Sequence, residues 1–286
     1  MEASSEPDPI RFRAAVEPFL RADTARNQLL LGILHTVIAE PTVYPEVHLW
    51  SVRDAGEVVA AALRTPPHNV ALADPTDPTA IEPLAEAVMR DDPLAPGVVA
   101  NVPWADRFSA PWIERAGVVP RLTVLQGVFA LTRVREPRGA PGEVRRLSAT
   151  DREFVQRWFT AFADEALPEE MRERSRQRSR IDFLLDDSNA DAGLWSWDVD
   201  GEPRSLTGFT RIPGGGRIGP VYTPPAERGR GYASNLVAWI SSWLLETGAE
   251  ACYLYTDLAN PTSNKIYIDV GYEQVAESAN LEFDRA

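Results

Sequence analysis

The chain has 286 residues, of which 44% are hydrophobic, so it can form one large domain or two domains of ordinary size. Its 29 basic and 42 acidic residues give a net charge of −13, which disfavours nucleic acid as a partner. The acidity is typical of a protein kept soluble by its charge, and it only weakly favours a cationic small molecule as ligand. There is no apolar run of about 20 residues and no secretory-signal pattern at the N-terminus. The chain has one cysteine and three scattered histidines, which disfavours a metal site. We therefore expect a cytoplasmic globular protein with no membrane partner and no metal.

The spacing of apolar residues in the first half predicts alternating helices and strands. In chain order the expected elements are a helical region over 12–38, a hairpin over 47–63, a strand over 69–74, a helix over 80–90, a strand over 97–103, a short helix over 109–117 and two closing strands over 121–134.

A segment rich in proline, glycine and arginine separates the two halves. Residues 133–142 read RVREPRGAPG and have no apolar periodicity, which is typical of a linker. We place the linker at 137–142, between one domain over 1–136 and another over 143–286.

The second half repeats a similar order of elements with stronger signals. The expected elements are a strand over 144–149, helices over 151–167 and 169–187, a hairpin over 193–212, a strand over 217–225, a helix over 231–248, a strand over 251–257, a helix over 262–270 and one or two closing strands over 272–283. A helix that connects two strands implies a right-handed crossover and a parallel pair, whereas hairpins are antiparallel. The class is therefore α+β with mixed sheets, and the two halves resemble a tandem repeat.

Two glycines lie in the junction between the strand predicted over 217–225 and the next helix. The sequence Arg228-Gly-Arg-Gly-Tyr-Ala233 lets the backbone adopt unusual angles, and the first amide groups of the helix then point at one spot. Such a helix start favours an anion, most naturally a phosphate, to which Arg228 and Arg230 could add charge. An ordinary glycine-containing turn would give the same pattern, so the loop alone does not decide.

A second pattern begins after the strand over 251–257. Asn260 and Tyr267 flank a short predicted helix that ends at Gly271. Taken singly, Asn260 fits a simple helix cap and Tyr267 fits a core residue.

Together the two patterns resemble the GNAT superfamily of acyl-CoA-dependent N-acyltransferases. The phosphate-loop form [Q/R]-x-x-G-x-[G/A] is matched by Arg228, Gly231 and Ala233. The C-terminal form N-x-x-[S/A]-x-x-x-Y-x-x-x-G-[F/Y] is matched by Asn260, Ser263, Tyr267, Gly271 and Tyr272. The resemblance covers 143–286 and implies two GNAT-like domains, each a twisted mixed sheet flanked by helices, with central parallel strands splayed in the second. The first half lacks the glycine loop after its strand over 69–74 and is similar to a degenerate copy.

The resemblance also implies which residues hold acetyl-CoA, the expected co-substrate. The loop amides would bind the pyrophosphate, the main chain at the end of the preceding strand would pair with the pantetheine arm, and the Asn260 motif would complete the site. The implied donor-binding residues are Val221, Tyr222, Thr223, Arg228, Gly229, Arg230, Gly231, Tyr232, Ala233, Asn260 and Ser263. A backbone N–H near Val221 or Tyr222 would stabilise the oxyanion, and Tyr267 would be the general acid.

The implied activity is transfer of an acetyl group to a primary amine of a small molecule by direct attack in a ternary complex. The strand before the loop carries no carboxylate, so the general base is Asp198, Asp257 or Glu169 acting through water, or there is none. Two alternatives stay open: acetylation of a protein or peptide amine, and a non-catalytic acyl-CoA-binding sensor.

Other chemically interesting residues have simpler interpretations. Trp195 and Trp197 are expected to pack, although one face could line an acceptor pocket, and Cys252 is expected to be an inert core thiol. The arginine-rich run 172–180 is typical of a solvated helix face, with a contact to a phosphate as the alternative. The three histidines lie in the first half and are expected to have no catalytic role.

Overall fold

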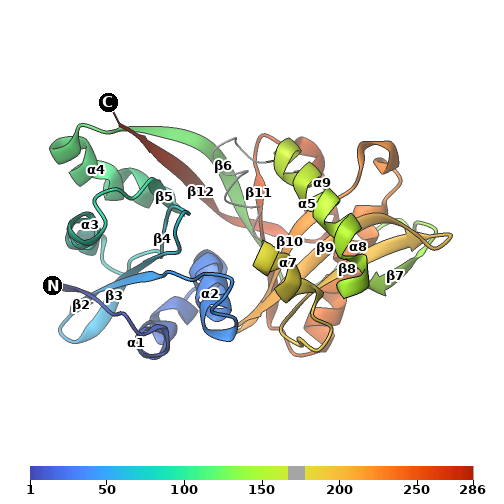
Figure 1. Cartoon of the computed structure of the whole chain (residues 1–286), viewed down its shortest axis with the longest axis horizontal. Coiled ribbons are helices and arrows are strands. Elements are labelled where there is room, and N and C mark those ends of the chain that lie inside the picture. The colour runs from blue at the N-terminus through green and yellow to red at the C-terminus, as the bar shows by residue number, and fades with distance from the viewer. Residues whose placement is uncertain (167–177, 286) are drawn as a thin grey trace. The chain divides into compact units, whose positions relative to one another are not determined.

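The structure, a computed structural model, describes residues 1–166 and 178–285. The chain divides into two compact units: residues 1–128 together with 275–286, and residues 129–274 (Figure 1). The predicted linker 137–142 therefore lies inside the second unit, and the last strand of the chain belongs to the first.

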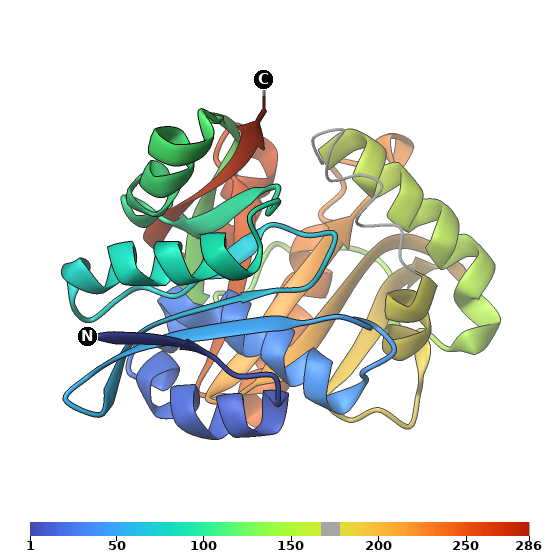
Figure 2. The same ribbon diagram turned by 60° about the vertical axis from the view of Figure 1, so that its left-hand side comes forward.

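The first unit is a mixed sheet with helices on its faces. Its elements are β1 (Glu2–Ser5), α1 (Pro9–Arg21), α2 (Thr24–Ala39), β2 (His48–Asp54), β3 (Glu57–Arg64), β4 (Val70–Leu72), α3 (Ile81–Asp91), β5 (Gly97–Asn101), α4 (Trp104–Ala116), β6 (Val119–Leu131) and β12 (Glu273–Asp284). Strand β1 lies antiparallel along β2 at the edge of the sheet (Figure 2), and β4 and β5 form the parallel pair. Helices α3 and α4 bury their apolar residues against the sheet in one core cluster.

The C-terminal strand β12 occupies an interior position of this sheet, between β5 and β6 (Figure 1). It pairs antiparallel with β5 from Ser278 opposite Asn101 to Glu282 opposite Gly97. Its alternate residues Ala279, Leu281 and Phe283 join the core of the first unit. The apolar alternation of β12 was evident in the sequence, but alternation does not say which sheet a strand joins.

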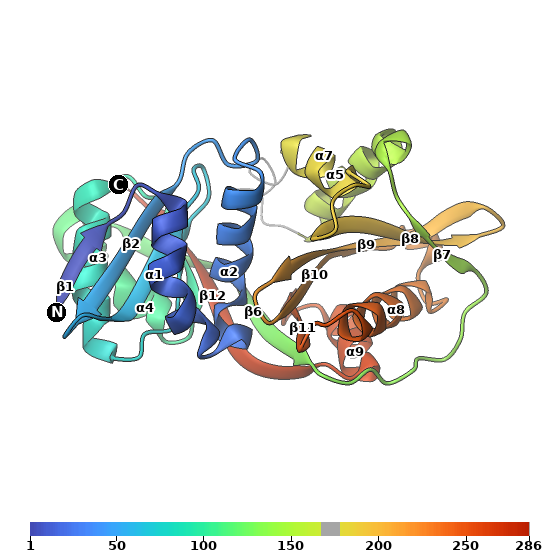
Figure 3. The ribbon, with the colours of Figure 1, turned by 90° about the horizontal axis from the view of Figure 1, so that it is seen from below.

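The second unit is a mixed sheet of order β7-β8-β9-β10-β11 with helices on both faces (Figure 3). Its elements are β7 (Glu143–Arg146), α5 (Arg152–Ala166), α7 (Arg178–Leu185), β8 (Ala192–Val199), β9 (Glu202–Ile212), β10 (Gly215–Tyr222), α8 (Tyr232–Glu246), β11 (Ala251–Asp257) and α9 (Pro261–Val270). One core cluster joins the sheet to α8 and α9, and another joins its opposite face to α5 and α7.

The order of elements repeats along the chain, as predicted, and two details differ. The first half ends in one long strand, β6, where two were predicted, and the N-terminal strand β1 was not predicted. The second half ends in the single strand β12, within the prediction of one or two. The predicted helix over 169–187 lies partly outside the described residues, which contain α7 (Arg178–Leu185) of it. No helix in the described parts of the chain is both long and apolar enough to cross a bilayer.

We predict that Gly97→Ala destabilises the first unit by about 2 kcal/mol, because its Cβ would overlap the carbonyl oxygen of Leu281 on the paired strand β12. Neither backbone can move without breaking the ladder. Thermal and denaturant unfolding measure the loss, with Gly139→Ala as control, since a Cβ there has no atom within 4 Å. Equal stability of the two variants would contradict the pairing of β12 with β5.

We predict that Cys252 does not react with thiol reagents in the folded protein. Its side chain is fully buried in β11, and desolvation raises the pKa of the thiol to about 12, so almost no thiolate exists at pH 8. An aromatic disulfide reagent should modify less than about one tenth of the thiol under native conditions and all of it after denaturation. Rapid modification of the native protein would show that β11 is open to solvent.

Candidate active site

The parallel strands β10 and β11 pair only at their beginnings. Residues 215–217 of β10 pair with 251–253 of β11, and the described residues show no pair between these strands further along. On its other side β10 stays paired with β9 as far as Tyr222, with a register irregularity between Ile218 and Val221. The end of β10 therefore lacks a strand partner towards β11, which is the separation of central strands that the sequence resemblance predicts.

The predicted residues Val221, Tyr222 and Thr223 lie at this end of β10. The carbonyl of Tyr222 already accepts a hydrogen bond from the Ser205 hydroxyl (3.2 Å), and the carbonyl of Thr223 accepts one from Arg228 Nε (2.9 Å). Val221 directly follows Pro220, which has no N–H.

The loop between β10 and α8 has the backbone geometry of an anion site. Gly229 and Gly231 have φ values of +77° and +83°, in the left-handed region that favours glycine. Gly231 is the N-cap of α8, and no side chain caps the helix, so the N–H groups of its first turn, from Tyr232 and Ala233 onward, are left for a ligand or water. The positive end of the helix dipole acts at the same place.

The two loop arginines are each bound to a carboxylate. Arg228 pairs with Glu165 of α5, and Arg230 Nη1 lies 3.3 Å from Glu227 Oε2. Glu227 also binds Arg204 at 3.1 Å. The positive charge that both arginines were expected to add is therefore partly neutralised within the protein.

Glu165 is a site residue that the sequence analysis missed. Besides Arg228, its carboxylate accepts a hydrogen bond from the hydroxyl of Tyr222 at 3.0 Å. Burial, together with this carboxylate, raises the pKa of Tyr222. No local pattern marks Glu165, because it is one of several acidic residues near the end of an amphipathic helix.

The C-terminal pattern forms α9 and the turn after it. The side chain of Asn260 accepts a hydrogen bond from the Ser263 N–H at 3.1 Å and so caps α9. Tyr267 is buried in the core cluster below α8, and its ring meets that of Tyr272 edge to face with centroids 6.1 Å apart. Both roles that the sequence analysis gave as simple alternatives, the cap and the core residue, are therefore present in the structure.

The hydroxyl groups of these two tyrosines differ in their partners. Tyr272 and Ser241 share a hydrogen bond of 2.9 Å, whereas the Tyr267 hydroxyl makes none with any described residue. Burial raises the pKa of Tyr267, so its hydroxyl keeps its proton at neutral pH. It is thus a proton donor without a partner.

The three candidate bases have different surroundings. Asp198 on β8 is buried and binds Arg145 Nε at 2.6 Å, and Arg145 in turn binds Asp151, so this carboxylate ties β7 to β8. Asp257 ends β11 and accepts a hydrogen bond from the Ala259 N–H at 2.8 Å. Glu169 lies outside the described residues, as does most of the arginine-rich run 172–180.

The remaining candidates are packing residues. Trp195 and Trp197 are buried in the core of the second unit, and the indole N–H of Trp197 donates to the Pro141 carbonyl at 2.9 Å. The histidines all lie in the first unit. No group of three or more histidine, cysteine or acidic side chains is placed to hold a metal in the described residues.

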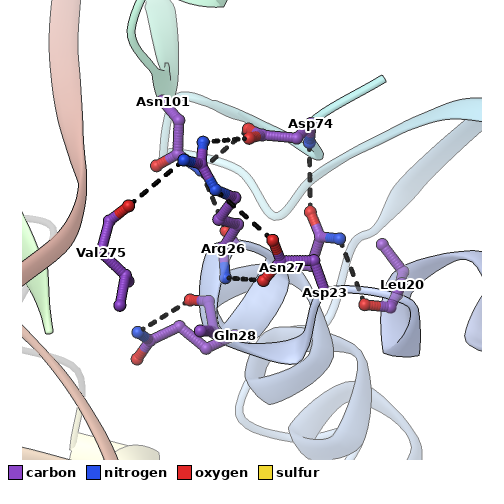
Figure 4. A network of polar contacts seen from close by, with 9 residues as sticks. Leu20, Asp23, Arg26, Asn27, Gln28, Asp74, Asn101 and Val275 are labelled. Atoms are coloured by element: carbon purple, nitrogen blue, oxygen red, sulfur yellow. Dashed lines mark hydrogen bonds and ion pairs between the residues drawn. The ribbon is translucent and has the colours of Figure 1, made fainter. Parts of the chain in front are cut away.

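The first unit has different chemistry at the ends of its parallel pair. Asp74 follows β4 and Asn101 ends β5, and the Asn101 amide donates to the Asp74 carboxylate at 2.8 Å (Figure 4). Arg26 binds the same carboxylate at 3.0 Å and the Val275 carbonyl at 3.2 Å, and Asn27 accepts from the Asp74 N–H at 3.1 Å. Burial raises the pKa of Asp74. In the first unit, side chains thus connect the ends of the two parallel strands. In the second unit, the corresponding strand ends stay apart.

Comparison with known proteins shows what the second half of the chain is similar to. The model of the acetyltransferase (GNAT) family matches residues 152–272. No curated protein matches the chain in sequence.

Solved structures share the whole-chain fold at low identity. A Drosophila protein is 12% identical with a TM-score of 0.69, and the match covers 98% of each chain. A tandem GNAT protein from the clavulanic acid biosynthesis pathway is 14% identical with a TM-score of 0.56, again over 98% of each chain. A GCN5-related N-acetyltransferase from Sphaerobacter thermophilus is 16% identical with a TM-score of 0.54, over 99% of this chain and 96% of its own.

At these identities the solved structures show the fold alone, and the family match covers residues 152–272 of the second half. Residues 152–272 thus match the acetyltransferase (GNAT) family, and the whole chain shares its fold with a tandem GNAT protein.

Proposed function

We propose that the chain transfers an acetyl group from acetyl-CoA to a primary amine of a small molecule by direct attack in a ternary complex. The observation that carries the proposal is the separation of β10 from β11, followed directly by a glycine loop and an uncapped helix start. The net charge of −13 supports a cationic acceptor.

In this proposal the donor binds by main-chain groups of the second unit. The N–H groups from Arg228 to Ala233 hold the pyrophosphate, and the main chain around Val221 pairs with the pantetheine arm as an added strand. Asn260 and Ser263 fix the start of α9 beside β11. A backbone N–H at Val221 or Tyr222 stabilises negative charge on the thioester oxygen during attack.

Tyr267 protonates the departing thiolate. Its buried hydroxyl is held in the neutral form by its raised pKa and has no described hydrogen-bond partner to compete with the sulfur. A phenol is a suitable acid for a thiolate, because the pKa values of phenols and thiols are not far apart.

The amine loses its proton to water or to Asp257. Asp257 ends β11, the strand that separates from β10, which supports it over Asp198, whose carboxylate is held by Arg145. Glu165 is bound to Arg228 and Tyr222 and has the role of positioning the loop.

The first unit has no donor site in this proposal. Its β4 runs into Ala73–Pro78 without a glycine loop, and Asp74 with Asn101 joins the strand ends where a pantetheine arm would lie. One acetyl-CoA should therefore bind per chain.

We predict that Gly229→Asp weakens CoA binding at least about tenfold, because it adds a carboxylate beside the phosphate site. A Cβ at Gly229 has open space, and aspartate and asparagine tolerate positive φ better than other residues, so the fold should persist. Gly229→Asn is the matched control with the same shape and no charge. Calorimetry with CoA measures both, and no binding by the folded wild type would refute the proposed function.

We predict that Tyr267→Phe lowers turnover at least about a hundredfold without changing CoA affinity, because it removes the proton donor. Release of the CoA thiol over a panel of primary amines is the assay, and the buried Cys252 does not interfere with thiol detection.

Tyr272→Phe is the matched control for this substitution. It removes a hydroxyl that is bound to Ser241 and should lower stability by about 1 kcal/mol while keeping turnover. Full activity of the Tyr267 variant would exclude the acid role, and a wild type that binds CoA but acetylates no amine would favour a sensor.

A further inference from the structure

The segment of residues 133–142, which we call the strap, is bound to the second unit although its sequence is typical of a free linker. In Figure 3 it runs past α9 and α8 towards β7. Hydrogen bonds hold it along its length: from the Arg135 N–H to the Val270 carbonyl (2.7 Å), from the Asn235 amide to the Arg138 carbonyl (3.0 Å) and from the Trp197 indole to the Pro141 carbonyl (2.9 Å).

The middle hydrogen bond places the strap beside the phosphate loop. The Asn235 amide, in the first turns of α8, donates both to Arg138 and to the carbonyl of Gly231 at 2.9 Å. A Cβ built on Gly231 would lie 3.7 Å from Ala140 Cβ and 3.8 Å from the Arg138 carbonyl oxygen. The backbone at Arg138 therefore lies close to Gly231, the N-cap of α8. Because the amide covers the Arg138 carbonyl, that oxygen is not left to repel an anion.

The charges around the loop single out Arg138. Arg228 and Arg230, which belong to the loop, are paired with Glu165 and Glu227. The Arg138 side chain is exposed and has no ion pair or hydrogen bond with any described residue. Among the described arginines next to the start of α8, Arg138 is thus the one whose charge no carboxylate compensates.

We propose that Arg138 is a donor-binding residue, whose guanidinium binds a phosphate group of CoA. The strap is then part of the donor site, held at the right place by Asn235. This inference rests on the proposed function, because it assigns a further residue to the same site. Arginine suits the task, since its planar fork can donate two parallel hydrogen bonds to one phosphate.

The test is calorimetry of CoA binding to the full-length wild type, Arg138→Gln and Arg133→Gln. Arg133 is the matched control: it is an exposed arginine of the same strap, its side chain has no described partner, and its carbonyl lies near Gly271 rather than Gly231. We expect Arg138→Gln to weaken binding roughly fivefold to tenfold and Arg133→Gln less than twofold. The difference should shrink when the salt concentration is raised from 50 to about 300 mM, as for an ion pair at the surface.

Titration with 3′-dephospho-CoA then identifies the group that is bound. If Arg138→Gln binds 3′-dephospho-CoA as tightly as the wild type does, Arg138 is assigned to the 3′-phosphate. If the variant binds this ligand more weakly than the wild type does, Arg138 is assigned to the pyrophosphate. Both results support the proposal. Equal affinities of the two variants would overturn it while leaving the proposed function intact. Absence of CoA binding by the wild type would instead refute the proposed function itself. Unchanged thermal unfolding of both variants confirms that binding is compared between folded proteins.

Discussion

The departure of β10 from β11 after Arg217 is the constraint that organises the second unit. A parallel pair that stayed in register would satisfy its own backbone groups and leave no edge inside the sheet. Because the strands separate, β10 needs other support, and it receives this from β9 on one side and from the Glu165 contacts at its end. The glycine loop and α8 start where the paired part of β10 ends. In the proposed function, the arm and the phosphates of the donor would therefore meet continuous main chain.

The two units show how one order of elements can lead to different chemistry. Both have a parallel pair followed by a helix, but Asp74, Asn101 and Arg26 bond across the strand ends of the first. A partly buried network of this kind is stable only when its members find partners, and Asp74 has three. A ligand could not enter the same position without breaking those bonds. Internal cross-links thus join the strand ends in the first unit, whereas the second unit leaves its strand ends apart.

Local chemistry decided how much could be predicted from the sequence. The loop Arg228–Ala233 and the helix after Asn260 were predictable because positive φ demands glycine and a helix start favours asparagine. The sheet that β12 joins, the pairing of Glu165 with Arg228 and the docking of the strap were not. Each of these features depends on a contact between residues that are far apart in the sequence. The local sequence around a glutamate or in a proline-rich segment does not indicate which distant residue it will contact.

The position of β12 has a consequence for the order in which the protein is made. Residues 273–284 are synthesised after the second unit, yet they fill the place between β5 and β6 of the first unit. Until then the nascent first unit has a gap in its sheet, with the edges of β5 and β6 unpaired. The sheet of the first unit is therefore completed only after the whole second unit has been synthesised, although most of the first unit precedes it in the chain.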